Sequence, residues 1–171
     1  VIQDRKTYWL GAYPQKSKTA AETAESLLDF LGPGVRGKHI YSDNSKELEK
    51  ASADLGMQHD TSTPHRPETN GIAEAAVKRV KEGTSCNIYQ SGFHEFWWSY
   101  AMICYAFLRN IVDILASGMT AWKMRFGIDF DGPIIPFGSA IEYYPISPKD
   151  KARLPKIGKK LLPGIFIGYK Q

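Results

Sequence analysis

Two acidic residues stand where separate elements of the chain could share a divalent metal ion. Asp43 follows the run 39–42, whose residue types predict a short buried strand. Glu74 falls near the first turn of a longer helix that is expected to begin at about Gly71. Two carboxylates repel each other unless a cation lies between them, and Mg²⁺ or Mn²⁺ prefers such oxygen ligands. Such a pair would serve phosphoryl transfer, in which metal ions activate the attacking oxygen and stabilise the leaving one.

The same two positions also suit purely structural roles. An Asp that ends a strand often caps the next helix, and a Glu in a first helical turn interacts favourably with the helix dipole. The spacing of Asp43 and Glu74 therefore leaves a metal site and a pair of capping residues both open.

The elements around these residues alternate between strands and helices, which is typical of an α/β fold. Asp43 would then lie at the carboxyl edge of a mixed sheet, where such proteins gather ligands. The capping box of Thr19 and Glu22 predicts a helix over 20–31. The other predicted elements are a hairpin over 1–13, a strand at 39–42, a helix at about 45–55, a strand at 57–62, the helix from about Gly71 and a helix over 93–112.

Hydrophobic periodicity separates the packing faces of the two long helices from their exposed faces. The residues expected to pack in the first of them are Ile72, Ala76 and Val80, and those expected to face outward are Glu74, Lys78 and Lys81. The helix over 93–112 is strongly apolar. We therefore expect Trp97 and Trp98 to belong to the core rather than to stack on bases.

The composition fits a folded domain with one core. Of the 171 residues, 43% are hydrophobic and 12% aromatic, which argues against disorder. The most apolar stretch, residues 100–108, is far shorter than the roughly 20 residues of a membrane-spanning helix, so no membrane partner is expected. Cys86 and Cys104 have no partner at zinc-ligand spacing, so neither a disulfide framework nor a structural zinc is predicted.

Positive charge is concentrated near the C-terminal end. Residues 147–171 hold seven lysines and arginines against Asp150 alone, a net charge of +6 in a chain whose total is +4. From about Gly132 the sequence turns to Pro, Gly and short β-type runs, as in a small β-barrel or a hairpin extension. We therefore expect a core over residues 1–128 and a basic, β-rich extension over 129–171. The extension indicates either a nucleic-acid partner or an ordinary solvated face.

Two motifs surround the acidic residues. Residues 41–47 read YSDNSKE, and residues 67–74 read PETNGIAE. They resemble the "SDNGGEF" and "PQQNGVAE" motifs of integrases from copia-type (Ty1/copia) retrotransposons, in the retroviral integrase superfamily. Residues 119–127 and 160–169 resemble the "TPYELWFG" and "KGIFLGY" segments of the same elements. The resemblance thus spans nearly the whole chain and suggests a fragment of a gag-int-pol polyprotein.

This resemblance implies an RNase H-like mixed sheet flanked by helices. It also implies an enzyme that processes and joins DNA 3′ ends with Mg²⁺ (or Mn²⁺) held by an Asp, Asp, Glu triad. By position, Asp43 is the second acid and Glu74 the third, each both catalytic and metal-binding. The implied partners are the element's DNA ends and target DNA, in a homo-oligomer located in the nucleus. The DNA contacts that we expect are Asn70, Lys78 and Lys81 in the core, and Lys156, Lys159 and Lys160 in the extension.

The first acid of the triad has no clear match. Residues 4–9 resemble the family's "DDYSRYTW" turn, which follows the strand that carries the first catalytic Asp, so Asp4 is assigned to a turn. We expect the first strand and its Asp to lie before Val1, so that this chain binds DNA weakly and does not integrate. Only 30 residues separate Asp43 from Glu74, fewer than is usual in the family, and a shortened loop there could displace Asp43.

Two other functions stay open. A decayed or domesticated, non-catalytic nucleic-acid-binding module would account for the unmatched first acid and the basic extension. An RNase H-like nuclease that only hydrolyses would share the fold, although residues 70–74 and the C-terminal motif fit it less well.

Overall fold

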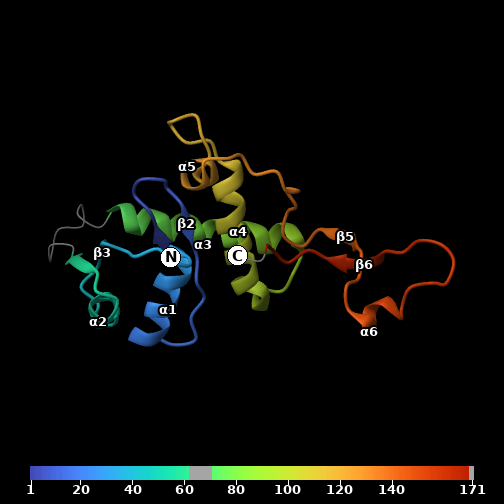
Figure 1. The fold of residues 1–171 in the computed structure, drawn as a ribbon, viewed down its shortest axis with the longest axis horizontal. Coiled ribbons are helices and arrows are strands. Elements are labelled where there is room, and N and C mark those ends of the chain that lie inside the picture. Colours follow the sequence, from blue (N-terminus) through green and yellow to red (C-terminus); the bar gives the residue numbers. More distant parts are fainter. Residues whose placement is uncertain (62–70, 170–171) are drawn as a thin grey trace.

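The computed structural model of the chain describes residues 1–61 and 71–169 (Figure 1). The first half contains β1 (Ile2–Gln3), β2 (Leu10–Gly11), α1 (Ala20–Leu31), β3 (His39–Ser42), α2 (Lys46–Asp54) and β4 (Gln58–Thr61). The second half contains α3 (Gly71–Ser91), the 3₁₀ turn η2 (Glu95–Trp97), α4 (Trp98–Val112), α5 (Ala121–Phe126), β5 (Ala140–Tyr143), α6 (Pro148–Lys151) and β6 (Leu162–Ile165). The alternation of strands and helices confirms the predicted α/β class.

The strands form three separate pairs in the described residues. β1 and β2 are antiparallel, β3 and β4 are parallel, and β5 and β6 are antiparallel. In place of one continuous mixed sheet, the core therefore has two small sheets, one antiparallel and one parallel, and no ladder joins them in residues 1–61. The pair β5–β6 is a hairpin, which is one of the two forms predicted for the extension.

Local sequence sets the ends of α1. The Thr19 hydroxyl accepts a hydrogen bond from the backbone N–H of Glu22 at 3.3 Å, which satisfies a donor of the first turn. Gly32 ends the helix with a φ of 85°, a conformation that costs glycine little. The predicted bounds of this helix, 20–31, are confirmed, because Thr19 and Gly32 set its two ends.

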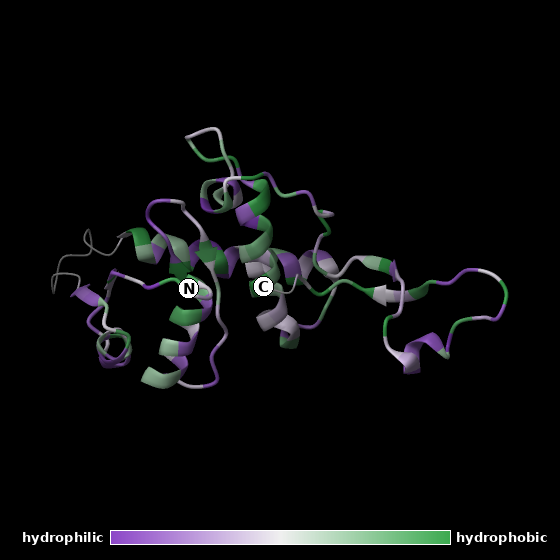
Figure 2. Cartoon of the chain, viewed as in Figure 1, coloured by the Kyte–Doolittle hydropathy of each residue, from purple (hydrophilic) through white to green (hydrophobic). Residues whose placement is uncertain are grey.

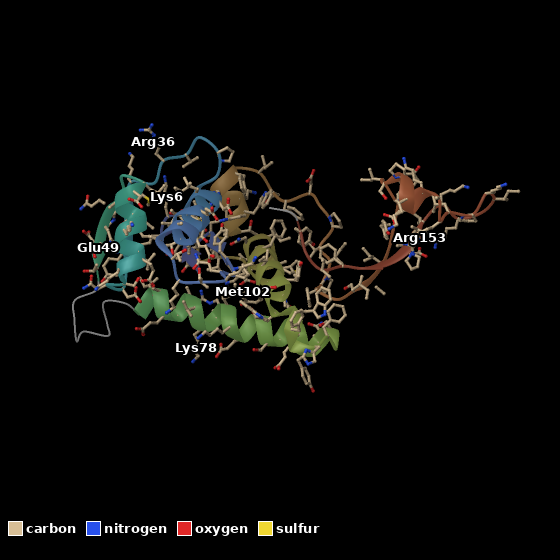
Figure 3. All side chains as sticks on the ribbon, turned by 90° about the horizontal axis from the view of Figure 1, so that it is seen from below. Lys6, Arg36, Glu49, Lys78, Met102 and Arg153 are labelled. Carbon is tan, nitrogen blue, oxygen red and sulfur yellow. The ribbon has the colours of Figure 1, made fainter. Side chains whose placement is uncertain are left out.

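The core lies where α3 and α4 pack against each other and against β2. One buried cluster consists of Leu10, Ala12, Ala76, Val80 and Ala106, and Met102 points into it from α4 (Figure 3). A second cluster joins the extension to α4 through Ala101, Cys104 and Phe137. Gly83 lets α3 approach α4 closely, because a Cβ atom there would overlap the ring of Tyr105. The core thus fixes α3, the helix that carries Glu74.

Two predictions of burial were wrong. Ile72 is 61% exposed and lines an open cavity of about 380 Å³ together with Gln3 and Tyr8. Trp97 and Trp98 are 39% and 46% exposed. The predicted helix over 93–112 begins as an α-helix only at Trp98, after the 3₁₀ turn η2, so Trp97 and Trp98 lie at the exposed start of α4.

Polar and apolar residues are distributed unevenly over the elements. Figure 2 colours α6 and much of α2 as hydrophilic. In the described ranges, 1–61 and 71–169, no helix has both the length and the hydrophobicity required to cross a membrane.

Candidate functional site

Asp43 lies directly after β3, at an edge built by a parallel pair. Residues 39–42 of β3 pair in register with residues 58–61 of β4, so both strands end at the same edge. Asp43 is exposed, and its carboxylate forms no hydrogen bond or ion pair with the described residues. Ser45, not Asp43, occupies the N-cap position of α2 and makes no side-chain capping bond. Asp43 is thus not used as a helix cap.

Glu74 lies in the first turn of α3 and is also exposed. Its carboxylate has no hydrogen-bond or ion-pair partner within residues 1–61 and 71–169. The positive end of the helix dipole stabilises a carboxylate at this position. The strands β3 and β4 lie at the same end of the molecule as the beginning of α3 in both views (Figures 1 and 3). Asp43 and Glu74 therefore share one end of the core.

Lys78 and Lys81 follow Glu74 along the outward face of α3, as predicted. Both side chains are exposed, and Lys78 projects away from the body (Figure 3). The Nζ atom of Lys78 is 3.9 Å from Oε1 of Glu82, and both side chains are mostly in solvent, so the pair is weak. These ammonium groups are available to an anionic partner. Asn70, the other DNA contact predicted for the core, lies outside the described residues.

Asp4 is committed to the turn between β1 and β2, as its sequence context predicted. Its carboxylate accepts a hydrogen bond from the backbone N–H of Thr7 at 2.8 Å and another from the Thr7 hydroxyl. Burial opposes ionisation of Asp4, but hydrogen bonds from Thr7 and Lys6 and the charge of Arg125 outweigh it and lower the pKa of the carboxyl. Asp4 is therefore an ionised turn residue, occupied by its own loop.

The strands β3 and β4 make side-chain contacts next to Asp43 that the sequence did not reveal. The Ser42 hydroxyl is 2.8 Å from Nε2 of His59 on the neighbouring strand and donates to the carbonyl of Asp43 at 2.8 Å. His39 and Asp60 form a second contact between the strands at 2.7 Å. The histidines had no visible partner in the sequence because these contacts depend on the β3–β4 register. Ser42 and His59 fix the backbone that carries Asp43.

The donor set fits part of a metal site. In the described part of the chain no group of three or more His, Cys, Asp and Glu side chains could hold a metal ion. Asp43 and Glu74 are two accessible carboxylates that are not paired with any described residue, and carboxylate oxygens are the ligands that Mg²⁺ and Mn²⁺ favour. Asp60 and Asp4 are less suitable, because His39 and Thr7 engage them.

The predicted basic residues of the extension differ in their contacts. Lys159 forms an ion pair with Glu142 of β5. Lys160 donates to the carbonyls of Pro155 and Lys156, the latter at 2.9 Å. Lys156 is exposed and forms no side-chain hydrogen bond or ion pair with the described residues.

Comparison of sequences finds no matching protein-family model. Two curated relatives from Arabidopsis thaliana are similar, the retrovirus-related Pol polyproteins from transposons RE2 and RE1. Their identities to this chain are 27% over 116 residues and 28% over 117 residues. Each match covers 64% of this chain and 8% of the relative, so the chain spans a small part of the polyproteins that it matches.

Comparison of structures finds retroviral integrases. One match is a chain of the simian T-cell lymphotropic virus intasome in complex with PP2A regulatory subunit B56 gamma. Its TM-score is 0.59 at 19% sequence identity, and the match covers 95% of the present chain and 59% of the intasome chain. A second match is the HTLV-2 integrase catalytic core domain in complex with magnesium, in its trimeric form. Its TM-score is 0.56 at 18% sequence identity, and the match covers 71% of the present chain and 80% of the HTLV-2 chain. The dimeric form of the same HTLV-2 core has a TM-score of 0.51 at 19% sequence identity, and the match covers 74% of the present chain and 81% of the HTLV-2 chain. The chain is thus related in sequence to retrovirus-related Pol polyproteins of plant transposons and has the RNase H-like fold of the retroviral integrase catalytic core.

Proposed function

We propose that this chain is the DNA-integrating part of a transposon polyprotein, with Asp43 and Glu74 as ligands of one divalent-metal site. The observation that carries the proposal is a pair of exposed carboxylates that have no partner among residues 1–61 and 71–169. One follows β3 and the other lies in the first turn of α3, and these two elements lie at the same end of the core (Figure 1). Its fold and its sequence relatives support the same class of activity. The chain spans 8% of each relative, so the substrates and partners of the whole protein are part of the proposal.

Mg²⁺ or Mn²⁺ at these carboxylates supplies activation of an attacking oxygen and stabilisation of a leaving one on a DNA phosphodiester. The magnesium named for the HTLV-2 core supports this choice of cation. Asp43 follows a strand end at which the Ser42 hydroxyl contacts His59 and the Asp43 carbonyl, so these contacts help to place its backbone. Glu74 is held by a helix whose next turns are buried at Ala76 and Val80.

Lys78 and Lys81 have a separate role in the proposal. They follow Glu74 at i+4 and i+7, so their ammonium groups extend from the same helix face. Phosphate contacts from such lysines position a duplex without reading its sequence. We expect the Lys78→Ala, Lys81→Ala double variant to bind a duplex more weakly and to reduce the slope of log K against log salt by about 2. Lys16→Ala, an exposed lysine in the loop before α1, is the matched control, and an equal effect of both variants would contradict the assignment.

The chain by itself is proposed to bind DNA without joining it. Asp4 is engaged by Thr7 and so does not serve as a third free carboxylate. A strand-transfer assay with Mg²⁺ is expected to give no joined product from the 171-residue chain. Joining that is lost in Asp4→Asn would overturn this expectation and make Asp4 the first acid.

A non-catalytic nucleic-acid-binding module is the second candidate. The basic extension favours it, because its charge lies on elements other than those that carry Asp43 and Glu74. This candidate predicts salt-sensitive DNA binding together with no binding of Mn²⁺ at Asp43 and Glu74.

Under the first candidate, the chain is also proposed to form a homo-oligomer. The dimeric and trimeric forms named for the HTLV-2 core support this part of the proposal.

A further inference from the structure

The hairpin β5–β6 with its connecting segment, residues 144–161, forms an arm that extends away from the body (Figure 1). The base of the arm is anchored. Gly138 donates to the carbonyl of Phe166 at 2.8 Å, and Phe166 donates to the carbonyl of Ser139 at 2.9 Å. Tyr169 stacks on Phe107 of α4 with the ring centroids 4.3 Å apart. The arm therefore starts from a fixed point on the core.

An isoleucine in the segment that connects the two strands of this arm is almost fully exposed to water. Ile157 is 93% exposed, more than any other exposed large hydrophobic residue in the described part of the chain. Ile146, on the other side of α6, is 86% exposed. Keeping an isoleucine in water forgoes the gain from its burial, so a partner that covers it gains binding free energy.

The loop that carries Ile157 is held in shape by two lysines. Lys160 donates to the carbonyls of Pro155 and Lys156, which closes the loop across Ile157. Lys159 pairs with Glu142 of β5, an exposed ion pair that contributes little to stability but agrees with the same loop shape. Gly158 turns the chain with a φ of 112°, which a side chain would disfavour. The ammonium groups of Lys159 and Lys160 thus already have contacts within the arm, so we assign them to the conformation of the loop around Ile157 rather than to a partner.

The charge around Ile157 identifies the kind of partner. Residues 144–161 contain six lysines and arginines and one acidic residue, Asp150. Arg153 is paired with Asp150, whereas the side chains of the exposed residues Lys149, Lys151 and Lys156 form no ion pair with the described residues. An arm with several basic side chains and an exposed isoleucine matches the way minor-groove proteins hold phosphates and insert an apolar wedge between base steps.

We infer that this arm binds duplex DNA with Ile157 as a wedge in the minor groove, which bends the duplex. In this arrangement Lys149, Lys151 and Lys156 contact phosphates, and Lys159 and Lys160 hold the loop. The inference rests on the proposed function only in requiring that the chain binds DNA. It adds a mode of binding on a surface distinct from Asp43 and Glu74.

The test measures bending and affinity separately with the full chain. A duplex of about 30 base pairs with a fluorophore at each end reports bending as energy transfer, and anisotropy of the same duplex reports affinity. The wild-type chain is expected to increase energy transfer. Ile157→Ser is expected to abolish most of that increase and to weaken binding about tenfold, with an unchanged salt slope. Because Ile157 makes no buried contact, the variant is expected to keep the wild-type circular dichroism spectrum.

Matched variants separate the wedge from the charge. Ile146 is a second highly exposed isoleucine of the same arm, and the Ile146→Ser variant is expected to bend DNA as the wild type does. The Lys149→Ala, Lys151→Ala variant is expected to lower the salt slope by about 2. Wild-type binding without bending, or bending that Ile157→Ser leaves intact, would overturn the inference while leaving DNA binding in place. An absence of salt-sensitive binding would overturn both the inference and the proposed function.

Discussion

The side-chain amide of Asn110 on α4 hydrogen-bonds both polar backbone groups of Leu10 on β2, across a hundred positions of sequence. Asn110 Nδ2 donates to the carbonyl of Leu10 at 2.8 Å, and the N–H of Leu10 donates to Asn110 Oδ1 at 2.9 Å. Both residues are 1% exposed. One side chain therefore takes the place of a neighbouring strand for Leu10 and joins the N-terminal hairpin to the helical core.

Replacing this amide is expected to destabilise the fold strongly. Asn110→Leu leaves the N–H and carbonyl of Leu10 buried without partners, which costs about 3 kcal/mol of unfolding free energy. Urea unfolding followed by circular dichroism measures this loss. Gln90→Leu, an exposed amide near the end of α3, is the control and is expected to change stability by less than about 0.5 kcal/mol. Equal effects of the two variants would contradict the role of Asn110.

The contact of α3 with α4 predicts an unusual response to alanine. Alanine favours a helix over glycine by about 1 kcal/mol, so Gly83→Ala would be stabilising on an exposed surface. Here the added Cβ meets the ring of Tyr105, and we expect a net loss of about 2 kcal/mol. Gly71→Ala, in the same helix but facing open space, provides the comparison. Thermal unfolding of both variants decides the matter, and a stabilised Gly83→Ala would disprove the close approach.

Asp4 predicts a stability change in acid. The pKa of its carboxyl is lowered in the folded chain, so ionised Asp4 stabilises the fold above the ordinary carboxyl pKa of about 3.9. That stabilisation is lost as the pH falls through the lower folded value. The difference in unfolding free energy between the wild type and Asp4→Asn should therefore be constant near neutral pH and shrink below about pH 4. A difference that does not vary with pH would show that the charge of Asp4 has no part in the turn.

The two cysteines are expected to react at different rates with a thiol reagent. Cys86 is exposed, whereas Cys104 is buried, and burial raises the pKa of the Cys104 thiol to about 11. The thiolate is the reactive form, so one equivalent should react quickly in the native chain and two in denaturant. Rapid loss of both thiols without denaturant would contradict the packing of Cys104 against Phe137 and Phe93.

The accuracy of the sequence predictions depends on how local their causes are. The helix over 20–31 could be bounded because Thr19 and Gly32 act on their own turns. Asp4 could be assigned to a turn for the same reason. The exposure of Trp97 depends on where α4 begins after η2, which the strongly apolar sequence of this segment does not indicate.

Contacts between residues far apart in the chain could not be predicted from the sequence. The contact of His59 with Ser42 requires the register of a parallel pair, and Leu10 gives no sign that Asn110 satisfies its backbone. The same limit applies to the site. The positions of Asp43 and Glu74 on their elements were predictable from motif and periodicity. In contrast, the use of Lys159 and Lys160 as loop anchors depends on Glu142 and two carbonyls that only the fold brings near.

Asp43 and Glu74 are proposed to bind the same divalent ion. Mn²⁺ broadens the NMR resonances of amides close to it, so a titration of the isotope-labelled chain tests the claim without requiring activity. We predict that the amides of residues 42–44 and 73–75 broaden together, and that Asp43→Asn reduces broadening in both segments. Broadening of one segment alone, or broadening near Glu74 that Asp43→Asn leaves unchanged, would contradict the shared site.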